Sequence, residues 1–372
     1  MKTRAAIIQK VRSFFISKGY LELDTPLLCR DLIPESCLEV FQTERVFPAG
    51  SRARNYPLWL IPSPEIWMKK IISRHCVNVF QICKCFRNGE STGHLHNSEF
   101  TMLEYYTMDA DYLDSLALTE ELFNHFTTEY TQALGGIEEK TNNENTREPG
   151  GKTRKNWSGK KKITPFKRVT VAESFEKYAG FDLFNEAEKG SGAMAAQARR
   201  LGLEPARELT VQQLYDLIFI HAVEPCLKDE KPVALLDYPA FVPCLARIKN
   251  RPPRAIGSET ESDSLSYVTE RWELYHNGIE LANCFSEETD PGKVKQFFLN
   301  ESAEKERSAV VKHKIDHDYY KIFGETNSSR GDSGEGHRFP HCSGTAMGLD
   351  RFIMALTGRS SIDSVLPFPE RY

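Results

Sequence analysis

The sequence has no long apolar stretch of the kind that spans a membrane or directs secretion. Nowhere among its 372 residues do about 18 apolar residues follow one another, which is the minimum for a transmembrane helix. The N-terminal stretch MKTRAAIIQKVRSFFISKGY interrupts its apolar residues with charged ones, unlike a secretory signal. We therefore expect a cytoplasmic protein without a membrane partner.

An excess of basic charge and a paired cysteine pattern are also missing. The chain has 48 Lys and Arg against 52 Asp and Glu, a net charge of −4, so no field over the whole chain would attract nucleic acid. The nine cysteines are odd in number and lie in apolar stretches, as is usual in a reducing compartment. Cys83 and Cys85 lack a second pair at zinc-site spacing, which favours ordinary thiols over a zinc site.

The composition is that of a globular protein, with 40% hydrophobic and 27% charged residues. Apolar residues at helical spacing predict a helix over 4–18, followed by a strand over Tyr20–Thr25. A second helix is predicted over Leu113–Leu134, and two or three helices from Val169 to about Leu227, interrupted at Gly190–Gly192.

Two aromatic and β-branched segments, Val79–Phe86 and Glu99–Tyr106, are predicted to be strands joined by a polar loop. The loop is long, because hairpin connections usually contain about two to five residues. Arg87 leaves the first strand, and Glu104 and Tyr106 lie on the second. These residues suit a small ligand with phosphate and amine groups, although a solvated hairpin fits the pattern equally well.

Another helix is expected to begin at Ser63-Pro64-Glu65, after a short apolar strand. Ser63 is predicted as its N-cap and Pro64 as its first residue. Glu65 in the first turn would favour the helix dipole, so helix capping explains this triplet as well as ligand binding does.

The segment 272–287, WELYHNGIELANCFSE, predicts a hairpin with a type I′ turn at Asn277-Gly278. A two-residue turn would pair Glu273 with Ala282 and place Glu273 and Glu280 on one face, roughly 7 Å apart. Magnesium with substrate phosphates is the obvious ion for two such carboxylates. The alternative is an exposed outer face.

A third motif, CSGTAMGLDRFIMAL, covers Cys342–Leu356 and leads from small residues into a helix. Asp350 is predicted to cap this helix, which places Arg351 in its first turn. A cation there opposes the helix dipole unless an anion binds at the same place.

In this order, the segments resemble the catalytic domain of class II aminoacyl-tRNA synthetases, and specifically the lysyl branch. The class motifs correspond to Gly19–Pro26, Phe80–Glu104 and Gly344–Arg351, and the branch signatures to Ser63–Glu65, His96–Thr101 and Glu280–Asn283. The resemblance implies an α+β fold with a mixed, mostly antiparallel sheet flanked by helices, and a homodimer formed through the first motif. It also implies one catalytic domain over residues 1–372, with low-complexity insertions at about 135–163 and 325–338.

Lysyl-tRNA synthetases carry an anticodon-binding OB domain before the catalytic domain. Here the first motif begins at residue 19, so no such domain is expected. The short form, with Cys342–Gly344 and with Ala346 in place of the synthetases' usual glycine, resembles the elongation factor P–(R)-β-lysine ligase family. That family implies ATP and Mg²⁺ as cofactors, lysine or β-lysine as substrate and elongation factor P as protein partner, with tRNA not expected.

Two other functions stay open. One is a synthetase paralogue that charges tRNA or another acceptor, using the basic cluster Lys160–Lys162. The alternative interpretation of this cluster is that it is part of a disordered insertion without a binding role. The other is an inactive regulator that keeps the nucleotide pocket.

The resemblance also implies the site residues. Those for ATP are Arg87, Asn88, Glu90, Asn97, Phe100, Glu280, Leu281, Gly348 and Arg351. Those for the amino acid are Ser63, Glu65, Tyr106, Asn283 and Glu287. Magnesium is assigned to Glu273 and Glu280, and catalysis to Arg87 and Arg351.

Each of the main residues has an implied role. Arg87 would bridge the α-phosphate and the substrate carboxylate, and Arg351 would hold the far end of ATP. Phe100 would stack on adenine. Glu65 would bind the α- or β-amino group and Asn283 the carboxylate. The ε-ammonium group would lie against Tyr106 and Glu287.

Two departures from the family pattern affect the site. Gly89 displaces the usual glutamate of the second motif to Glu90, and Cys284 replaces a glycine after Asn283. Strict alternation would place Asn283 and Glu280 on opposite faces, so the strand must bulge if both serve one site. Glycine eases such a bulge, and cysteine makes it harder.

Overall fold

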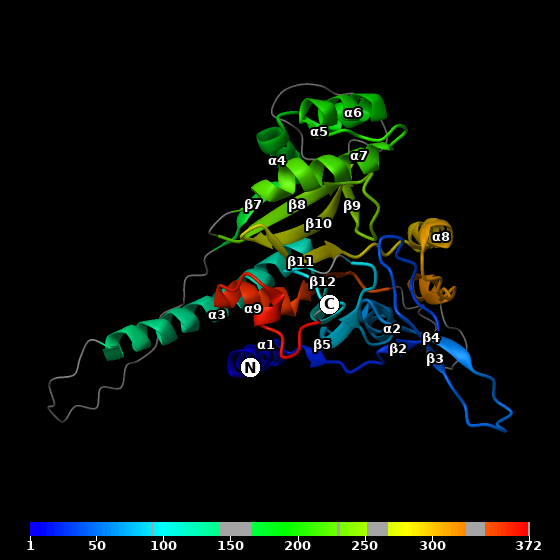
Figure 1. Cartoon of the computed structure of the whole chain (residues 1–372), viewed down its shortest axis with the longest axis vertical. Coiled ribbons are helices and arrows are strands. Elements are labelled where there is room, and N and C mark those ends of the chain that lie inside the picture. The colour runs from blue at the N-terminus through cyan, green and yellow to red at the C-terminus, as the bar shows by residue number, and fades with distance from the viewer. Residues whose placement is uncertain (91–92, 142–164, 229–230, 251–266, 325–338, 371–372) are drawn as a thin grey trace.

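The computed structural model describes residues 1–90, 93–141, 165–228, 231–250, 267–324 and 339–370. A large mixed sheet forms the centre of the fold, with helices on both faces (Figure 1). Its strands follow the order β1-β5-β6-β12-β11-β10-β8-β7, with β9 also pairing with β10. The β1–β5 and β7–β8 pairs are parallel, and the other pairs are antiparallel. A smaller sheet has the order β2-β4-β3. The expected α+β fold is confirmed.

The strands are β1 (Leu21–Glu22), β2 (Leu28–Cys29), β3 (Gln42–Arg45), β4 (Tyr56–Leu60), β5 (Val79–Phe86), β6 (Glu99–Met108), β7 (Lys167–Thr170), β8 (Val233–Pro239), β9 (Ile248–Asn250), β10 (Tyr267–His276), β11 (Ile279–Ser286) and β12 (Cys342–Gly348). The α-helices are α1 (Lys2–Ser17), α2 (Glu65–His75), α3 (Tyr112–Thr141), α4 (Val171–Ser174), α5 (Leu183–Glu188), α6 (Ser191–Arg200), α7 (Val211–Ile218), α8 (Pro291–Ser308) and α9 (Leu349–Thr357). Short helical turns are η1 (Phe175–Ala179), η2 (Phe219–Val223), η3 (Glu224–Cys226), η4 (Tyr319–Phe323) and η5 (Ile362–Ser364).

One face of the large sheet packs against helices α1, α3 and α9. Phe15 of α1, Leu116 of α3 and Phe352 of α9 share one buried cluster with Tyr105 of β6 and Cys284 of β11. Burial of apolar surface stabilises the fold by roughly 25 cal/mol per Å², so this layer fixes the position of β6, β11 and β12. The side chains that point the other way along these strands are then available for a site.

The opposite face is covered by helices at its two ends. Helices α4–α7 pack over β8 and β10 at one end (Figure 1). Helices α2 and α8 and the turn η4 form another cluster with β5, β6 and β12. Between these two clusters, polar side chains of β6 and β11 line a cavity.

Most of the predicted elements are present. Strand β5 has the predicted limits, and β6 continues two residues beyond its predicted end. The strand predicted over Tyr20–Thr25 forms ladder pairs only over Leu21–Glu22, where it pairs with β5 at the edge of the sheet. More helices than predicted lie between β7 and β8, since Thr170, Asp182 and Thr210 each cap a new one.

Some predictions fall on residues outside the described part of the chain. Helix α3 continues to Thr141, so the insertion boundary predicted at residue 135 lies inside it. Residues 142–163, with Lys160–Lys162, and the insertion 325–338 are not among the described residues. None of the helices within the described ranges has the length and apolar character that crossing a membrane requires.

Candidate active site

The pairing of β6, β12 and β11 places the predicted site residues on one sheet face. Glu104 of β6 is opposite Ala346 of β12, which in turn is opposite Asn283 of β11. Two residues along, Tyr106 is opposite Gly344. Since side chains alternate between faces, these residues all point away from the layer formed by α1, α3 and α9.

The β10–β11 hairpin has the predicted turn. Asn277 and Gly278 both have positive φ, at 52° and 76°, as a type I′ turn requires. Tyr275 pairs with Glu280, as predicted from the two-residue turn. This part of the register prediction is confirmed.

Beyond Glu280 the predicted register is wrong. Glu273 pairs with Asn283 instead of Ala282, because the ladder shifts between Leu274 and Tyr275 and leaves Leu281 without an opposite residue. Such a bulge changes which side chains share a face. Glu280 and Asn283 therefore point to the same side as Glu273, as a common site requires.

Cys284 does not form part of this bulge. It pairs with Trp272 in the regular ladder, has no positive φ, and is fully buried in the core. Cysteine at this position is therefore compatible with the bulge at Leu281.

Nearly all of the residues predicted for ATP line one cavity on this face. They are Arg87, Glu90, Asn97, Phe100, Glu280, Leu281, Gly348 and Arg351, and Asn283 joins them. Further lining residues that the sequence did not single out are Leu95, Met102, Ala282 and Ile362. Asn88 is not part of the lining, and its Nδ2 donates to the Val40 backbone oxygen at 3.3 Å.

Arg351 occupies the first turn of α9, as predicted, and is held from three sides. Its Nη1 donates to the Glu280 backbone oxygen at 3.0 Å, and its Nε donates to that of Leu95 at 3.2 Å. His96 Nε2 lies 2.7 Å from Nη2. Burial and the Arg351 charge lower the pKa of His96, so neutral His96 can accept a hydrogen bond from the guanidinium.

The prediction that Asp350 caps this helix is wrong. Gly348 occupies the N-cap position. Asp350 instead accepts a hydrogen bond from the Thr101 backbone N–H at 2.7 Å and pairs with Arg4 of α1 at 2.5 Å. This contact ties α1 and β6 to the start of α9.

Arg87 directly follows β5 and extends into the cavity. Its Cζ lies 5.3 Å from the centre of the Phe100 ring, and its Nη1 lies 3.7 Å from Glu90. Gly89 has φ 71°, a conformation that favours glycine. Arg87 Nε is buried and has no hydrogen-bond partner among the described residues.

Glu280 and Glu273 lie near each other, but their surroundings differ. Burial, followed by the charge of Glu273, raises the pKa of Glu280 to about 7. Glu273 accepts hydrogen bonds from Arg271 at 2.5 Å and from the Tyr275 hydroxyl at 2.7 Å, so both of its oxygens are engaged. Within the described ranges, no three His, Cys, Asp or Glu side chains form a group able to hold a metal. Magnesium binding by this pair stays a prediction.

A second cluster of polar side chains, mostly acidic and buried, begins at the N-terminus of α2, and we name it the acidic cluster. The N-cap is Pro64, one residue later than predicted, but the Ser63 hydroxyl still accepts a hydrogen bond from the Glu65 N–H at 3.0 Å. The same hydroxyl donates to Glu104 at 3.1 Å. Ser63 thus links the start of the helix to the middle of β6.

Glu104 belongs to this cluster, as its place on the predicted hairpin suggested, although the site residues implied by the family resemblance did not include it. It accepts a hydrogen bond from the Tyr106 hydroxyl at 2.8 Å and is almost fully buried. Burial, followed by the charge of Glu65, raises the pKa of Glu104 to about 8. A glutamate within the apolar strand Glu99–Met108 was the available sequence signal.

Glu287, just after β11, and Glu65 are bridged by Lys69, which the sequence analysis did not identify. Lys69 Nζ lies 2.7 Å from Glu65 Oε1 and 2.8 Å from Glu287 Oε2. Burial raises the pKa of Glu287 to about 7, although the Lys69 charge opposes this shift. Glu287 Oε1 is buried and has no hydrogen-bond partner in the part of the chain that the structure describes.

Gly344 of β12 lies directly against Tyr106 and Glu287 of the acidic cluster. A Cβ atom at this position would lie 2.5 Å from the Tyr106 ring and 2.6 Å from Glu287 Oε1. Both distances are shorter than a van der Waals contact, so only glycine allows this approach.

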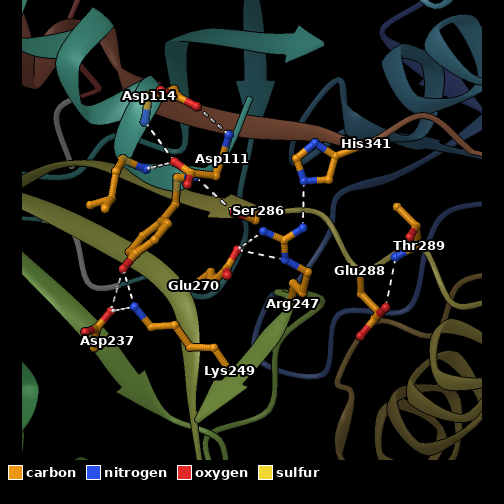
Figure 2. Close-up of polar contacts among 12 residues, drawn as sticks. Asp111, Asp114, Asp237, Arg247, Lys249, Glu270, Ser286, Glu288, Thr289 and His341 are labelled. Carbon is orange, nitrogen blue, oxygen red and sulfur yellow. Dashed lines mark hydrogen bonds and ion pairs between the residues drawn. The ribbon is translucent and has the colours of Figure 1, made fainter. Parts of the chain in front are cut away.

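Main-chain and ionic contacts hold Glu287 in place. Its N–H donates to the Cys342 backbone oxygen at 2.9 Å. The preceding carbonyl, of Ser286, accepts a hydrogen bond from the Arg247 N–H at 2.8 Å. Figure 2 shows the Arg247 guanidinium between Glu270, 2.6 Å away, and His341. The end of β11 is therefore anchored to β10 and to the segment before β12.

A protein-family model described as tRNA synthetases class II (D, K and N) matches residues 1–372. The chain belongs to this family. Among similar class II proteins is an elongation factor P–(R)-β-lysine ligase of Avibacterium paragallinarum, 30% identical over 366 residues, which are 98% of this chain and 94% of the relative. Ligases of the same name from Pasteurella multocida (strain Pm70) and Histophilus somni (strain 2336) are 28% and 29% identical, each over 98% of this chain and 93% of the relative. The resemblance inferred from the sequence motifs of this class II protein is confirmed.

Proposed function

We propose that the protein is an ATP-dependent ligase that activates lysine or (R)-β-lysine as an aminoacyl-adenylate and joins it to a lysine side chain of elongation factor P. The same proposal includes a single catalytic domain and a homodimer formed through Gly19–Pro26. The named relatives support the reaction class, and the site supports the kind of substrate.

The observation that carries the proposal is a pair of buried polar atoms without partners among the described residues. Arg87 Nε is a hydrogen-bond donor beside the cavity, and Glu287 Oε1 is a hydrogen-bond acceptor in the acidic cluster. Leaving such a group unpaired costs about 1–3 kcal/mol, so a ligand that satisfies both would bind favourably. An amino acid with a carboxylate at one end and an ammonium group at the other has this character.

The first step forms the adenylate. The substrate carboxylate is ionised at neutral pH, so it attacks the α-phosphate without a general base. A P–O bond forms, the bond to the β-phosphate oxygen breaks, and pyrophosphate leaves. Catalysis rests on positioning and on neutralising phosphate charge, the roles of Arg87 and Arg351.

In the second step, the amine of the acceptor lysine attacks the activated carbonyl. The new C–N bond forms an amide, AMP leaves with the C–O bond, and the amine proton passes to solvent. Amide formation requires the neutral amine as nucleophile. Phe100 in the cavity is assigned to adenine, and Asn283 to the substrate carboxylate.

Magnesium would supply charge neutralisation at the phosphates. Glu280 fits this role because it lines the cavity, and Mg²⁺ is commonly held by one or two carboxylates together with substrate phosphates. Glu273 fits less well, because Arg271 and Tyr275 engage both of its oxygens. We therefore assign Mg²⁺ to Glu280 first.

The test is ATP–pyrophosphate exchange with lysine and with (R)-β-lysine, followed by transfer to purified elongation factor P or to tRNA. We expect exchange with at least one amino acid and label transfer to the protein. Exchange with neither would refute the activation step. Transfer to tRNA but not to elongation factor P would instead identify a tRNA-charging paralogue.

A further inference from the structure

The acidic cluster contains an ammonium group of the protein itself. Lys69 is fully buried, and its Nζ lies within 2.8 Å of both Glu65 and Glu287. The family resemblance implies that these two carboxylates bind the amino groups of the substrate. One ammonium of the chain therefore bridges both receptor groups.

We propose that Lys69 is a positioning residue that holds the carboxylates of Glu65 and Glu287 in place and ionised. Each carboxylate then binds one ammonium group of the substrate, so that the acidic cluster selects amino acids with two ammonium groups. This inference rests on the proposed function. Lys69 acts through the two carboxylates and not on the reacting atoms.

The geometry of α2 and β11 supports this role. Glu65 and Lys69 are four residues apart on one helix, so their side chains meet on the same side. Glu287 approaches from the end of β11, where its backbone is anchored. The side chain of Glu65 is 22% exposed, whereas that of Lys69 is not exposed. Solvent therefore reaches the cluster at Glu65 and not at Lys69.

The charges around Lys69 explain why the carboxylates need it. The titratable groups that face it are Glu65 on α2, Glu104 on β6, Glu287 after β11, Tyr319 on η4, Cys342 on β12 and Glu35 in the segment after β2, and the Tyr106 ring lies 6.0 Å from Nζ. Burial opposes the Lys69 charge, but Glu287 and Glu65 hold its pKa well above the usual value. Carboxylates that are buried together without a cation become protonated.

A neutral Glu287 would bind an ammonium group poorly, because the charge-assisted hydrogen bond is lost. We assign Glu287 Oε1 to the substrate, because Oε1 has no hydrogen-bond partner among the described residues and Oε2 pairs with Lys69 at 2.8 Å. Removing the Lys69 charge should therefore weaken lysine binding most where Glu287 takes up a proton. A purely structural ion pair predicts loss of stability without such a pH dependence.

The experiment compares Lys69→Met, Lys69→Arg and the control Lys70→Met, whose charge lies on the same helix and pairs with Asp316. KM for lysine and for ATP is measured by exchange from about pH 6.5 to pH 8.5, where one pKa unit changes protonation tenfold. For Lys69→Met we expect KM for lysine to rise about tenfold or more at neutral pH, and the increase to shrink at higher pH. KM for ATP should stay within about twofold, and Lys69→Arg should restore most of the lysine affinity, since it keeps the charge.

A Lys69→Met variant with the KM for lysine and the pH profile of the unaltered protein would overturn the inference. Equal increases in KM for lysine and ATP would do the same, because they indicate a structural role. If Lys69→Met does not fold, Lys69→Met/Glu287→Gln removes the unpaired carboxylate as well. Its KM for lysine should lie within about threefold of Glu287→Gln alone, because residues in one network are not additive, and a larger difference contradicts the inference.

The failure of the proposed function has a different signature. In that case the unaltered protein shows no exchange with lysine or β-lysine, and the inference falls with the function. If the unaltered protein is active, the variants test Lys69 alone.

Discussion

Glu280 and Asn283 project from the same face of β11, because Leu281 is an extra residue in the pairing with β10. Both side chains line the cavity that the proposed function assigns to ATP. Without the extra residue, one of them would point into the core layer formed by α1, α3 and α9. The bulge is thus the local feature that lets a single strand present both a carboxylate and an amide to the same cavity.

Because the bulge lies at Leu281, replacing Cys284 by glycine should not improve the site. We expect Cys284→Gly to lower the free energy of unfolding by about 1–3 kcal/mol, since it removes a buried side chain and adds a flexible residue to a strand. KM for ATP should not change. Urea unfolding and exchange kinetics measure the two effects, with the exposed Cys226→Ala as control. A more stable variant would mean that Cys284 strains the bulge.

Arg87→Ala is expected to reduce adenylation by about a hundredfold or more, the usual effect of losing one preorganised group that binds the transition-state charge. Its Nε has no partner among the described residues, so the melting temperature should change little. Lys84→Ala is the control, because it removes a half-exposed charge from β5, the strand that directly precedes Arg87. The Lys84 ammonium lies 3.0 Å from Glu99. Exchange activity retained in Arg87→Ala would contradict its assigned role.

Local patterns in the sequence were sufficient for the elements that carry the site. Alternation predicted β5 and most of β6, and the Asn277-Gly278 turn set the first pairs of the β10–β11 hairpin. The bulge was anticipated only as a requirement, because an extra residue changes no local propensity. Its position at Leu281 depends on how both neighbouring strands pack.

Long-range contacts explain what the sequence did not reveal. Lys69 is one of many lysines on predicted helices, and its burial depends on Glu287, which is more than two hundred residues away. The local sequence predicts Asp350 as a helix cap, whereas its actual partners are Arg4 and the Thr101 backbone N–H, both distant in sequence. Such partners are brought together by the sheet order, which the sequence pattern alone does not specify.

The raised pKa values in the acidic cluster predict that the stabilisation of the fold by bound lysine depends on pH. Burial raises the pKa of Glu104 to about 8 and that of Glu287 to about 7. The folded protein therefore keeps protons that the unfolded chain releases near the ordinary glutamate pKa of 4.5. Without ligand, these groups stabilise the fold fully below this value, and their contribution is lost as pH rises through about 7 to 8.

Ammonium groups favour the ionised carboxylates, so lysine binding should release protons. We expect the increase in Tm caused by lysine to be larger at about pH 8 than at about pH 6. Thermal unfolding with and without lysine over this range measures the difference, and Glu104→Gln should reduce it. An equal increase in Tm at both pH values would show that neither carboxylate titrates with binding.

Gly344→Ala tests where the amino acid binds. The added methyl group would lie 2.5 Å from the Tyr106 ring and 2.6 Å from Glu287 Oε1, so these side chains must move. Overpacking of this kind costs about 1–3 kcal/mol, and we expect KM for lysine to rise about tenfold or more while KM for ATP stays unchanged. The control is Gly192→Ala in α6, where a Cβ meets no atom within 4 Å. If Gly344→Ala raised KM for ATP and lysine equally, the acidic cluster would not be a separate amino-acid site. A local change beside Tyr106 and Glu287 would then have disturbed the cavity assigned to ATP as well.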